Sequence, residues 1–288
     1  MISSKELVEL LSLERKTDQH YVGENYKTPW GRVFGGQVLG QSLHAAYQTV
    51  PKDRIAHSMH GYFILGGDIN IPIEYHVDNI RDGRSFTTRR VVAFQNRKAI
   101  FNMAASFHIN EEGENHQIQM PNVLTPELLL TDIQQAEGIQ QKDPERFLRV
   151  MKYHPRIFEF KPVDEAIYLK TRNSAPIAHI WFRIKDKIQV DLPTQQQILA
   201  FASDYSLLLS ATLPHREKLM NEKVYYASLD HALWFHRDFT IDDWLLYAIE
   251  SPSASNARGM TRGHIYTRKG ILIASVAQEG LIRPIDKK

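Results

Sequence analysis

Asp204 is the residue whose surroundings most strongly suggest chemistry. It is the only charged residue between Ile198 and Thr212, a stretch apolar enough to lie in a protein core. Burying a carboxylate is costly unless it is paired, protonated or hydrogen-bonded. The residues alone leave two interpretations open: a general base that orients a water, or a carboxylate at a wet helix edge bonded to backbone.

Two polar residues on predicted strands are weaker candidates. Gln278 ends the apolar run Ile271–Gln278, and its amide would hold a water or polarise a carbonyl without any proton transfer. Ser228 lies in a second strand-like segment. Taken singly, Gln278 is more simply explained as solvated, and Ser228 as bonded to neighbouring backbone.

The histidines raise the question of a metal site. His57 with His60, and His231 with His236, have odd separations, which on strands place the members of each pair on opposite faces. We therefore expect no metal at either pair. His231 directly follows Asp230, and that pair would instead support acid–base chemistry.

Composition excludes several classes of protein. The chain has 288 residues, no cysteine and a formal charge of +2, so disulfide frameworks, thiolate metal sites and cysteine nucleophiles are excluded. The near-balanced charge lacks the excess of positive charge that is typical of nucleic-acid-binding proteins. No uncharged apolar run approaches the ~20 residues that span a bilayer, and no nucleotide-binding glycine motif or serine-hydrolase elbow occurs. We expect no membrane insertion and no nucleic-acid partner.

The first residues carry no secretory signature. Residues 1–16 hold charged side chains throughout, with leucines at helical spacing, and predict a short amphipathic helix that Ser3 or Ser4 caps.

The chain is long enough for one large domain or two ordinary ones.

The elements that must position these candidates repeat along the chain. His60–Phe63 aligns with His231–Trp234, and Arg97–Phe101 aligns with Arg268–Leu272 at the same offset. Each half has an apolar helix followed by four strand-like segments, preceded by shorter extended pieces. The first half contains a helix at Gly36–Val50, strands at Ile55–Leu65, Ile71–Ile80, Ser85–Gln95 and Ala99–Ile109, and an extended piece at Tyr21–Gly23. The second half contains a helix at Thr194–Thr212, strands at Val224–Phe235, Trp244–Ser251, Met260–Thr267 and Ile271–Ile282, and extended pieces at Tyr168–Lys170 and Ile177–Ile184.

This order predicts an α+β protein made of two copies of one domain. We place the N-terminal domain at residues 1–120, a connector in which we find no functional motif at 121–162, and the C-terminal domain at 163–288. Gly36 and Gly40 have the spacing that would let the first helix approach a sheet closely.

Five segments carry a family resemblance in the right order over nearly the whole chain. They are Val33–Val38, His57–Phe63, Arg81–Phe86, Asp230–His236 and Ser251–Gly259. These segments resemble the acyl-CoA thioesterase II family, whose members are double hotdog proteins. The resemblance implies a tandem (double) hotdog fold, in which each half is a long helix wrapped by an antiparallel sheet.

The resemblance also implies an activity and its residues. Members hydrolyse fatty acyl-CoA to free fatty acid and coenzyme A with a water held by an Asp, a Thr or Ser, and a Gln. The matching positions are Asp204, Ser228 and Gln278, all in the second half. Serine keeps the hydroxyl but lacks the methyl group that stiffens threonine, so we expect looser water positioning.

Further expectations rest on the same resemblance. Backbone NH groups of Gly36 and Gln37 would stabilise the oxyanion, and no metal or cofactor is needed. Candidate cations for the phosphates of coenzyme A are Arg84, Arg89, Arg258 and Arg262. We expect a cytoplasmic homodimer or homotetramer of fatty acid and lipid metabolism, since Ile285–Lys288 matches no peroxisomal signal. The alternatives are an enoyl-CoA hydratase using Asp230 and His231, or a non-catalytic acyl-CoA-binding module.

Overall fold

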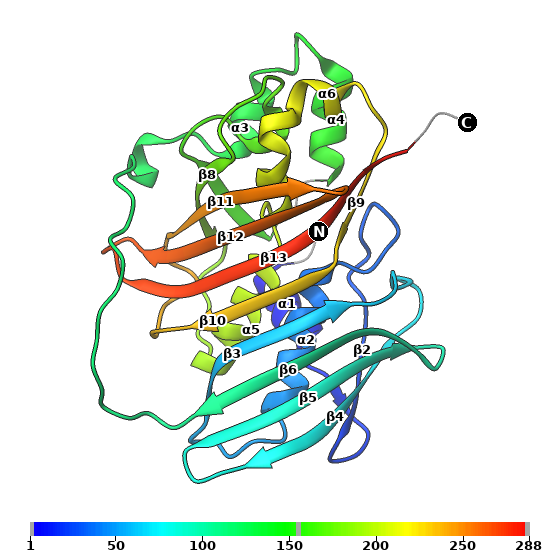
Figure 1. Cartoon of the computed structure of the whole chain (residues 1–288), viewed down its shortest axis with the longest axis vertical. Coiled ribbons are helices and arrows are strands. Elements are labelled where there is room, and N and C mark those ends of the chain that lie inside the picture. The colour runs from blue at the N-terminus through cyan, green and yellow to red at the C-terminus, as the bar shows by residue number, and fades with distance from the viewer. Residues whose placement is uncertain (1–2, 154–156, 286–288) are drawn as a thin grey trace.

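One antiparallel sheet organises the molecule. The computed structural model describes residues 3–153 and 157–285, and within them 13 strands form a single sheet (Figure 1). The strand order is β1-β2-β4-β5-β6-β3-β10-β13-β12-β11-β8-β7, and β9 pairs with β13. Two central helices, α2 and α5, lie against one face of this sheet (Figure 1).

The first half forms from alternating strands and one buried helix. Alternate residues of its strands are buried, because period-two patterning puts every second side chain on the core face. Asn96 and Arg97 adopt left-handed conformations (φ 49° and 61°) in the hairpin between β5 and β6. The elements are α1 (Ser4–Leu11), β1 (Glu14–Arg15), β2 (His20–Gly23), α2 (Gly35–Tyr47), β3 (Ile55–Phe63), β4 (Ile73–Asp82), β5 (Phe86–Gln95) and β6 (Lys98–His108).

The second half repeats this pattern after a segment of short helices. That segment holds η1 (Pro126–Leu128), α3 (Asp132–Glu137) and α4 (Pro144–Tyr153). The remaining elements are β7 (Phe158–Pro162), η2 (Ile167–Leu169), β8 (Ile177–Ile184), α5 (Leu192–Ser203), η3 (Leu208–His215), α6 (Arg216–Met220), β9 (Val224–Ser228), β10 (Asp230–Phe235), β11 (Leu245–Ser255), β12 (Arg258–Thr267) and β13 (Leu272–Pro284).

The repeat predicted from the sequence is visible in the sheet. Outward from the centre, β3-β6-β5-β4-β2 in one half matches β10-β13-β12-β11-β8 in the other. The two segments aligned by sequence, β3 and β10, pair with each other at the centre, with His231 opposite Gly61. Each half is therefore one helix wrapped by an antiparallel sheet.

The expected connector differs in extent from the observed one. β7 falls inside residues 121–162, yet it pairs with β8 and belongs to the second sheet half. α3 and α4 lie at the same end of the molecule as β8 and α6 (Figure 1). A division just before β7 describes the sheet better than one at residue 163.

The glycines of α2 serve a helix contact, where the sequence suggested a sheet contact. A Cβ on Gly36 would lie 2.2 Å from the carbonyl oxygen of Phe201, and one on Gly40 would lie 2.9 Å from that of Gln197. Both carbonyls belong to α5. The missing side chains let the two central helices touch backbone to backbone.

The second central helix is shorter than predicted. The expected helix to Thr212 stops at Ser203, and Ser206 adopts a left-handed conformation (φ 65°) before the chain resumes as the 3-10 helix η3. A left-handed residue cannot continue an α-helix, so the chain turns away at Ser206, two residues after Asp204. This break leaves the Asp204 carboxylate at a helix end.

Two further predictions change in detail. The expected strand at 224–235 divides at Leu229, because β9 pairs with the far end of β13 whereas β10 pairs with its near end and with β3. The extended piece expected at 168–170 largely lies in the 3-10 helix η2. By contrast, β8 spans Ile177–Ile184 as predicted.

The N-terminal helix is confirmed. Ser3 caps α1 and forms a reciprocal capping box with Glu6, while Leu7 and Leu11 are buried. Among the helices of residues 3–153 and 157–285, none combines the length and apolar character needed to cross a bilayer.

Candidate active site

Asp204 lies where the two halves of the molecule meet. It follows the last residue of α5, and its Oδ2 accepts a hydrogen bond from the backbone NH of Gly36, at the start of α2, at 3.0 Å. A Cβ on Gly35 would come within 2.7 Å of the same oxygen. The second half supplies the carboxylate, and the first half supplies a helix N-terminus whose partial positive charge favours it.

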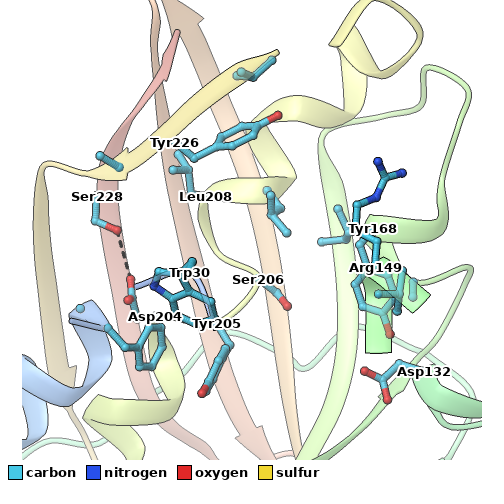
Figure 2. A pocket seen from close by; sticks show the side chains of 18 of the residues that line it. Trp30, Asp132, Arg149, Tyr168, Asp204, Tyr205, Ser206, Leu208, Tyr226 and Ser228 are labelled. Carbon is cyan, nitrogen blue, oxygen red and sulfur yellow. Dashed lines mark hydrogen bonds between the residues drawn. The ribbon is translucent and has the colours of Figure 1, made fainter. Parts of the chain in front are cut away.

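The structure brings Ser228 and Gln278 to this carboxylate. Ser228 Oγ donates to Asp204 Oδ1 at 3.3 Å, and Gln278 Nε2 donates to Ser228 Oγ at 3.0 Å. Figure 2 shows Ser228 pointing from its strand towards Asp204. The pairing of β9 with β13, in which Ser228 lies opposite Gly280, sets the two side chains next to each other.

The electrostatics suit a base. Burial raises the pKa of Asp204, while the charge of His231, the Gly36 amide and the side chains of Ser228 and Gln278 oppose that rise. A raised pKa makes the ionised carboxylate a stronger proton acceptor near neutral pH. Burial lowers the pKa of His231, which favours the neutral ring.

His231 forms a second layer behind the site. Its Nδ1 lies 2.6 Å from Gln278 Oε1 and its Nε2 lies 2.9 Å from Ser203 Oγ. The sequence singled it out as a possible acid–base partner of Asp230, but Asp230 Oδ1 instead accepts from the Glu279 NH at 2.6 Å. The adjacent Asp and His therefore act on different groups.

A cavity of about 920 Å³ opens in front of the site. Asp204, Ser228 and Gln278 all line it, whereas His231 does not. Its apolar wall is formed by Phe34, Phe160, Ile180, Tyr205, Leu208 and Leu209. Figure 2 shows Asp132, Arg149 and Tyr168 across the cavity from Asp204 and Ser228.

The cations of this cavity come from places the sequence did not suggest. They are Arg146, Arg149, Arg216 and Lys223. Arg146 and Arg149 belong to α4 in the connector, a segment whose sequence contains no recognisable functional motif. Arg216 is buried, and both burial and the nearby charge of Arg146 lower its pKa. Only the fold shows that the connector covers the site.

A second, smaller cavity meets the first. It has a volume of about 370 Å³ and a largely apolar lining. The residues that line both cavities are Trp30, Val33, Gly35, Tyr226, Ala227 and Ser228. Ser228 and the start of α2 thus lie between two separate spaces.

The amides expected to stabilise an oxyanion have other partners. Gly36 NH donates to Asp204, and Gln37 NH donates to the Phe34 carbonyl at 3.1 Å. The Gln37 side chain is buried and accepts from the Tyr26 NH at 2.8 Å. In this geometry the start of α2 holds the catalytic candidate, and Gly36 would have to leave Asp204 to serve an oxyanion.

None of the four expected phosphate ligands lines either cavity formed by the described residues. Arg89 is buried, with its guanidinium bonded to Thr49 and to Asp82 at 2.6 Å. Arg258 pairs with Glu279, Arg262 pairs with Glu250, and Arg84 is exposed at a strand turn. Strand arginines here pair across strands, a contact that linear spacing does not reveal.

The two histidine pairs behave differently. A register shift between Ala56 and Ser58 puts both His57 and His60 on the outer face, where His60 meets the ring of Trp234. The prediction of opposite faces is wrong for this pair, because a β-bulge breaks the alternation. His231 is buried and His236 is exposed, as predicted.

Family models cover both halves of the chain. Residues 26–108 match a model described as acyl-CoA thioesterase N-terminal domain, and residues 157–281 match one described as acyl-CoA thioesterase. An acyl-CoA thioesterase 2 from Haemophilus influenzae is 38% identical over 96% of each chain. Human acyl-coenzyme A thioesterase 8 is 37% identical over 95% of this chain and 88% of its own.

Solved structures agree with the fold. An acyl-CoA thioesterase II from Mycobacterium marinum superposes with a TM-score of 0.80 at 35% identity, covering 98% of this chain and 100% of its own. A protein from Alicyclobacillus acidocaldarius described as having a hot dog fold gives a TM-score of 0.75 at 15% identity, covering 98% and 99%. The expected double hotdog fold is confirmed. By sequence, by fold and by the match in both halves, the chain belongs to the acyl-CoA thioesterase family.

Proposed function

We propose that the protein hydrolyses fatty acyl-CoA to a free fatty acid and coenzyme A. The observation that carries the proposal is the meeting of Asp204, Ser228 and Gln278 at the floor of a large, partly apolar cavity. Membership of the acyl-CoA thioesterase family supports the same reaction.

In the proposed mechanism, a water is the nucleophile. Asp204 accepts its proton while Ser228 and Gln278 fix its position, and the water oxygen attacks the thioester carbonyl carbon. The carbon–sulfur bond then breaks, the acyl group leaves as the fatty acid, and coenzyme A leaves as the thiolate, which takes up the proton held by Asp204. Thiolate is a good leaving group at neutral pH, so a strong general acid is less important.

The test is an acyl-CoA chain-length series read with a thiol reagent. We expect thiol release from the wild type, and a loss of about 10²-fold or more in kcat for Gln278→Ala, as for removal of a positioning group in a general-base site. The absence of cysteine removes background from the protein itself. Absence of thiol release from every fatty acyl-CoA would overturn the proposal.

The same assay separates the alternative functions. A hydratase would consume crotonyl-CoA absorbance without releasing thiol, and a binding module would retain ligand without turnover. The hydratase alternative needs His231 at the substrate, but His231 lines neither cavity. No geometry among the described residues favours that reaction over hydrolysis.

We place the phosphates of coenzyme A at the cationic rim of the large cavity. Arg149 is the cleanest member to test, because it is exposed and lines the cavity. Arg149→Ala should raise KM for acyl-CoA but leave KM for the matching N-acetylcysteamine thioester, which has no phosphates, unchanged. Arg258→Ala, which removes a cation outside both cavities, is the matched control. Equal effects on both substrates would contradict this placement.

The remaining expectations concern assembly and location. Tyr62 (63% exposed) and Trp234 (36% exposed) place aromatic surface on the two central strands, which supports association into a homodimer or homotetramer. Analytical ultracentrifugation tests this, and a monomer at micromolar concentration would contradict it. A cytoplasmic location and a role in fatty acid metabolism stay predictions.

A further inference from the structure

A buried chain of polar side chains leads away from the reaction centre. It runs from Asp204 through Ser228 and Gln278 to His231 and ends at Ser203. Only the first three members line the large cavity. His231 and Ser203 are inside the protein, with exposed fractions of 1% and 0%.

The direction of hydrogen bonding along this chain decides what Gln278 offers to the site. An amide presents a donor at one end and an acceptor at the other, and neutral imidazole has one donor and one acceptor nitrogen. If His231 carries its proton on Nδ1, Gln278 Oε1 must accept, and Nε2 then faces Ser228 and Asp204 as a donor. If Nδ1 is bare, the amide reverses, and an acceptor faces the carboxylate.

Only the first arrangement stabilises an ionised base. Asp204 needs donors around it, and Gly36 NH, the Ser228 hydroxyl and the Gln278 amide nitrogen provide them. An amide oxygen turned towards the carboxylate would repel its negative charge. The arrangement therefore requires a hydrogen-bond donor next to Gln278 Oε1, on the side away from Asp204.

We propose that His231 is a positioning residue that holds the Gln278 amide with its nitrogen facing Asp204 and Ser228. This inference rests on the proposed function, since it concerns the residues that hold the water. His231 itself touches neither substrate nor water. In this tautomer His231 Nε2 carries no proton and must accept from the Ser203 hydroxyl, which lies 2.9 Å from both Nε2 and the Ala200 carbonyl and therefore gives its single proton to the ring instead of to Ala200.

Two substitutions separate positioning from packing. His231→Asn retains an NH donor near the place of Nδ1, whereas His231→Leu fills space without donating. We expect His231→Leu to lower kcat on the order of 10- to 100-fold with little change in KM, the range typical for groups that orient a functional ligand. His231→Asn should recover most of that loss. His236→Leu, an exposed position directly after the same strand, should leave kcat unchanged.

A pH profile supplies a readout that packing alone would not move. His231, Tyr205 and Tyr247 are the titratable groups that interact with Asp204, and Asp230 acts on His231. Burial raises the pKa of both tyrosines, so they stay neutral. Loss of the amide donor should move the acid limb of kcat/KM to higher pH in His231→Leu but not in His231→Asn. Equal kcat losses and equal profiles in the two variants would overturn the proposal.

Two controls keep this test independent of folding and of the main function. Nitrogen-15 NMR of the imidazole in the wild type reports the tautomer directly, and a proton on Nε2 alone would also overturn the inference. Thiol release by the wild type, together with its loss in Asp204→Asn, tests hydrolysis itself. Wild-type kinetics in His231→Leu would therefore refute the positioning role while leaving the proposed function intact.

A separate cluster of ligand-forming side chains lies on the outer face of the first sheet half. His20 and His76 are direct partners across β2 and β4, with ring centroids 4.4 Å apart, and Glu74 lies beside them. Glu74 Oε2 is 3.3 Å from His20 Nε2 and 3.8 Å from His76 Nε2. These atoms all lie within 4.8 Å of one another.

The separations of Glu74 Oε2 from the two histidine nitrogens, 3.3 and 3.8 Å, are close to what one small cation needs. Ligand atoms about 2.0–2.1 Å from a tetrahedral zinc lie roughly 3.3 Å from each other. His20 Nε2 is shielded from solvent and forms no hydrogen bond of good geometry with the described residues, although Glu74 Oε2 is 3.3 Å away, so a cation between the two atoms would satisfy both. We infer that His20, Glu74 and His76 bind a divalent transition metal of the zinc class, with the fourth position open to water.

Zinc titration of the full chain by calorimetry tests this site. We expect one equivalent to bind the wild type, with loss of at least tenfold in affinity in His76→Ala and in Glu74→Gln, consistent with removal of one of three ligands. His116→Ala removes a histidine outside the cluster and should bind like the wild type. Unchanged zinc binding in both cluster variants would overturn the assignment, and thiol release should not depend on zinc.

Discussion

The two ends of the α2–α5 helix pair occupy related places in the repeat but contain different chemistry. At one end, α5 finishes at Asp204 and meets the amide of Gly36. At the other, Tyr47 in the last turn of α2 donates to Gln196 in the first turns of α5, and Ala56 NH donates to the Tyr47 hydroxyl at 2.8 Å. At one end a carboxylate lines a cavity. At the other, which we call the neutral end, the side chains between the helices are uncharged and bonded to each other, and the Asp191 carboxylate lies exposed outside them.

The contrast shows how one scaffold supports a catalytic site at one end of the helix pair and not at the other. The charged end needs close backbone approach, which Gly35 and Gly36 allow, and a helix terminus that favours negative charge. The neutral end uses long side chains that satisfy each other and the Ala56 backbone. The first copy thus contributes the helix N-terminus that binds the carboxylate, and the second copy supplies the carboxylate itself.

The strongest test of the comparison removes one charge from each end of α5. Asp204→Asn should lower kcat by about 10²-fold or more, because the amide cannot accept the water's proton. Asp191→Asn, at the N-cap of the same helix, keeps a capping side chain and should leave kcat unchanged. Steady-state thiol release measures both, with circular dichroism to verify the fold. Comparable losses in the two variants would contradict a special role for the Asp204 end.

The next test uses pH. Because burial raises the pKa of Asp204 and the mechanism needs its ionised form, kcat/KM should fall about tenfold per pH unit below that pKa. The free energy of unfolding should change with pH in the opposite direction to kcat/KM. A raised folded-state pKa stabilises the fold fully below the unfolded pKa, and that contribution is lost as pH rises through the folded one. Urea unfolding at pH values between the unfolded-state and folded-state pKa of Asp204 should show a stability that falls with rising pH in the wild type but not in Asp204→Asn.

A smaller effect should separate the two glycine contacts. Gly36→Ala would put a methyl group against the Phe201 carbonyl and disturb the amide that holds Asp204, so both activity and stability should fall. Gly40→Ala crowds Leu11 and the Gln197 carbonyl, away from the site, and should lower mainly stability. Overpacking of this kind costs about 1–3 kcal/mol. The kcat of the folded fraction is the measurement, and an equal kcat in both variants would refute the distinction.

The smallest effect on activity is expected at the neutral end. Tyr47→Phe removes the donor to Gln196 and leaves the Ala56 NH without its acceptor, which should lower the free energy of unfolding by about 1–3 kcal/mol. The kcat should stay at the wild-type value, because this end lines neither cavity. Chemical denaturation and thiol release are the paired measurements. A loss of kcat in the folded variant would mean that the two ends communicate.

Much of the fold was accessible from the sequence because its signals are local. Alternation along strands, the capping serine of α1 and the repeated order of helix and strands all act between near neighbours. The isolated carboxylate in an apolar helix pointed to Asp204 for the same reason, since burial of charge needs an explanation wherever it occurs. Ser228 and Gln278 became specific only through the family resemblance.

Other features depended on contacts between distant residues. The sequence could not show that Gly36 NH would hold Asp204, that Arg89 would be satisfied internally by Thr49 and Asp82, or that Arg149 of the connector would reach the cavity. The bulge in β3 likewise put both of its histidines on one face, where strand alternation predicted opposite faces.

The two-copy α+β architecture, the family and the buried carboxylate could therefore all be predicted from the order of the residues. Which groups surround that carboxylate, and where the cavity's cations come from, became visible only in the folded chain. The physical reason is that periodicity and burial are set by neighbouring residues, whereas hydrogen-bond partners and cavity walls come from segments that only folding brings together.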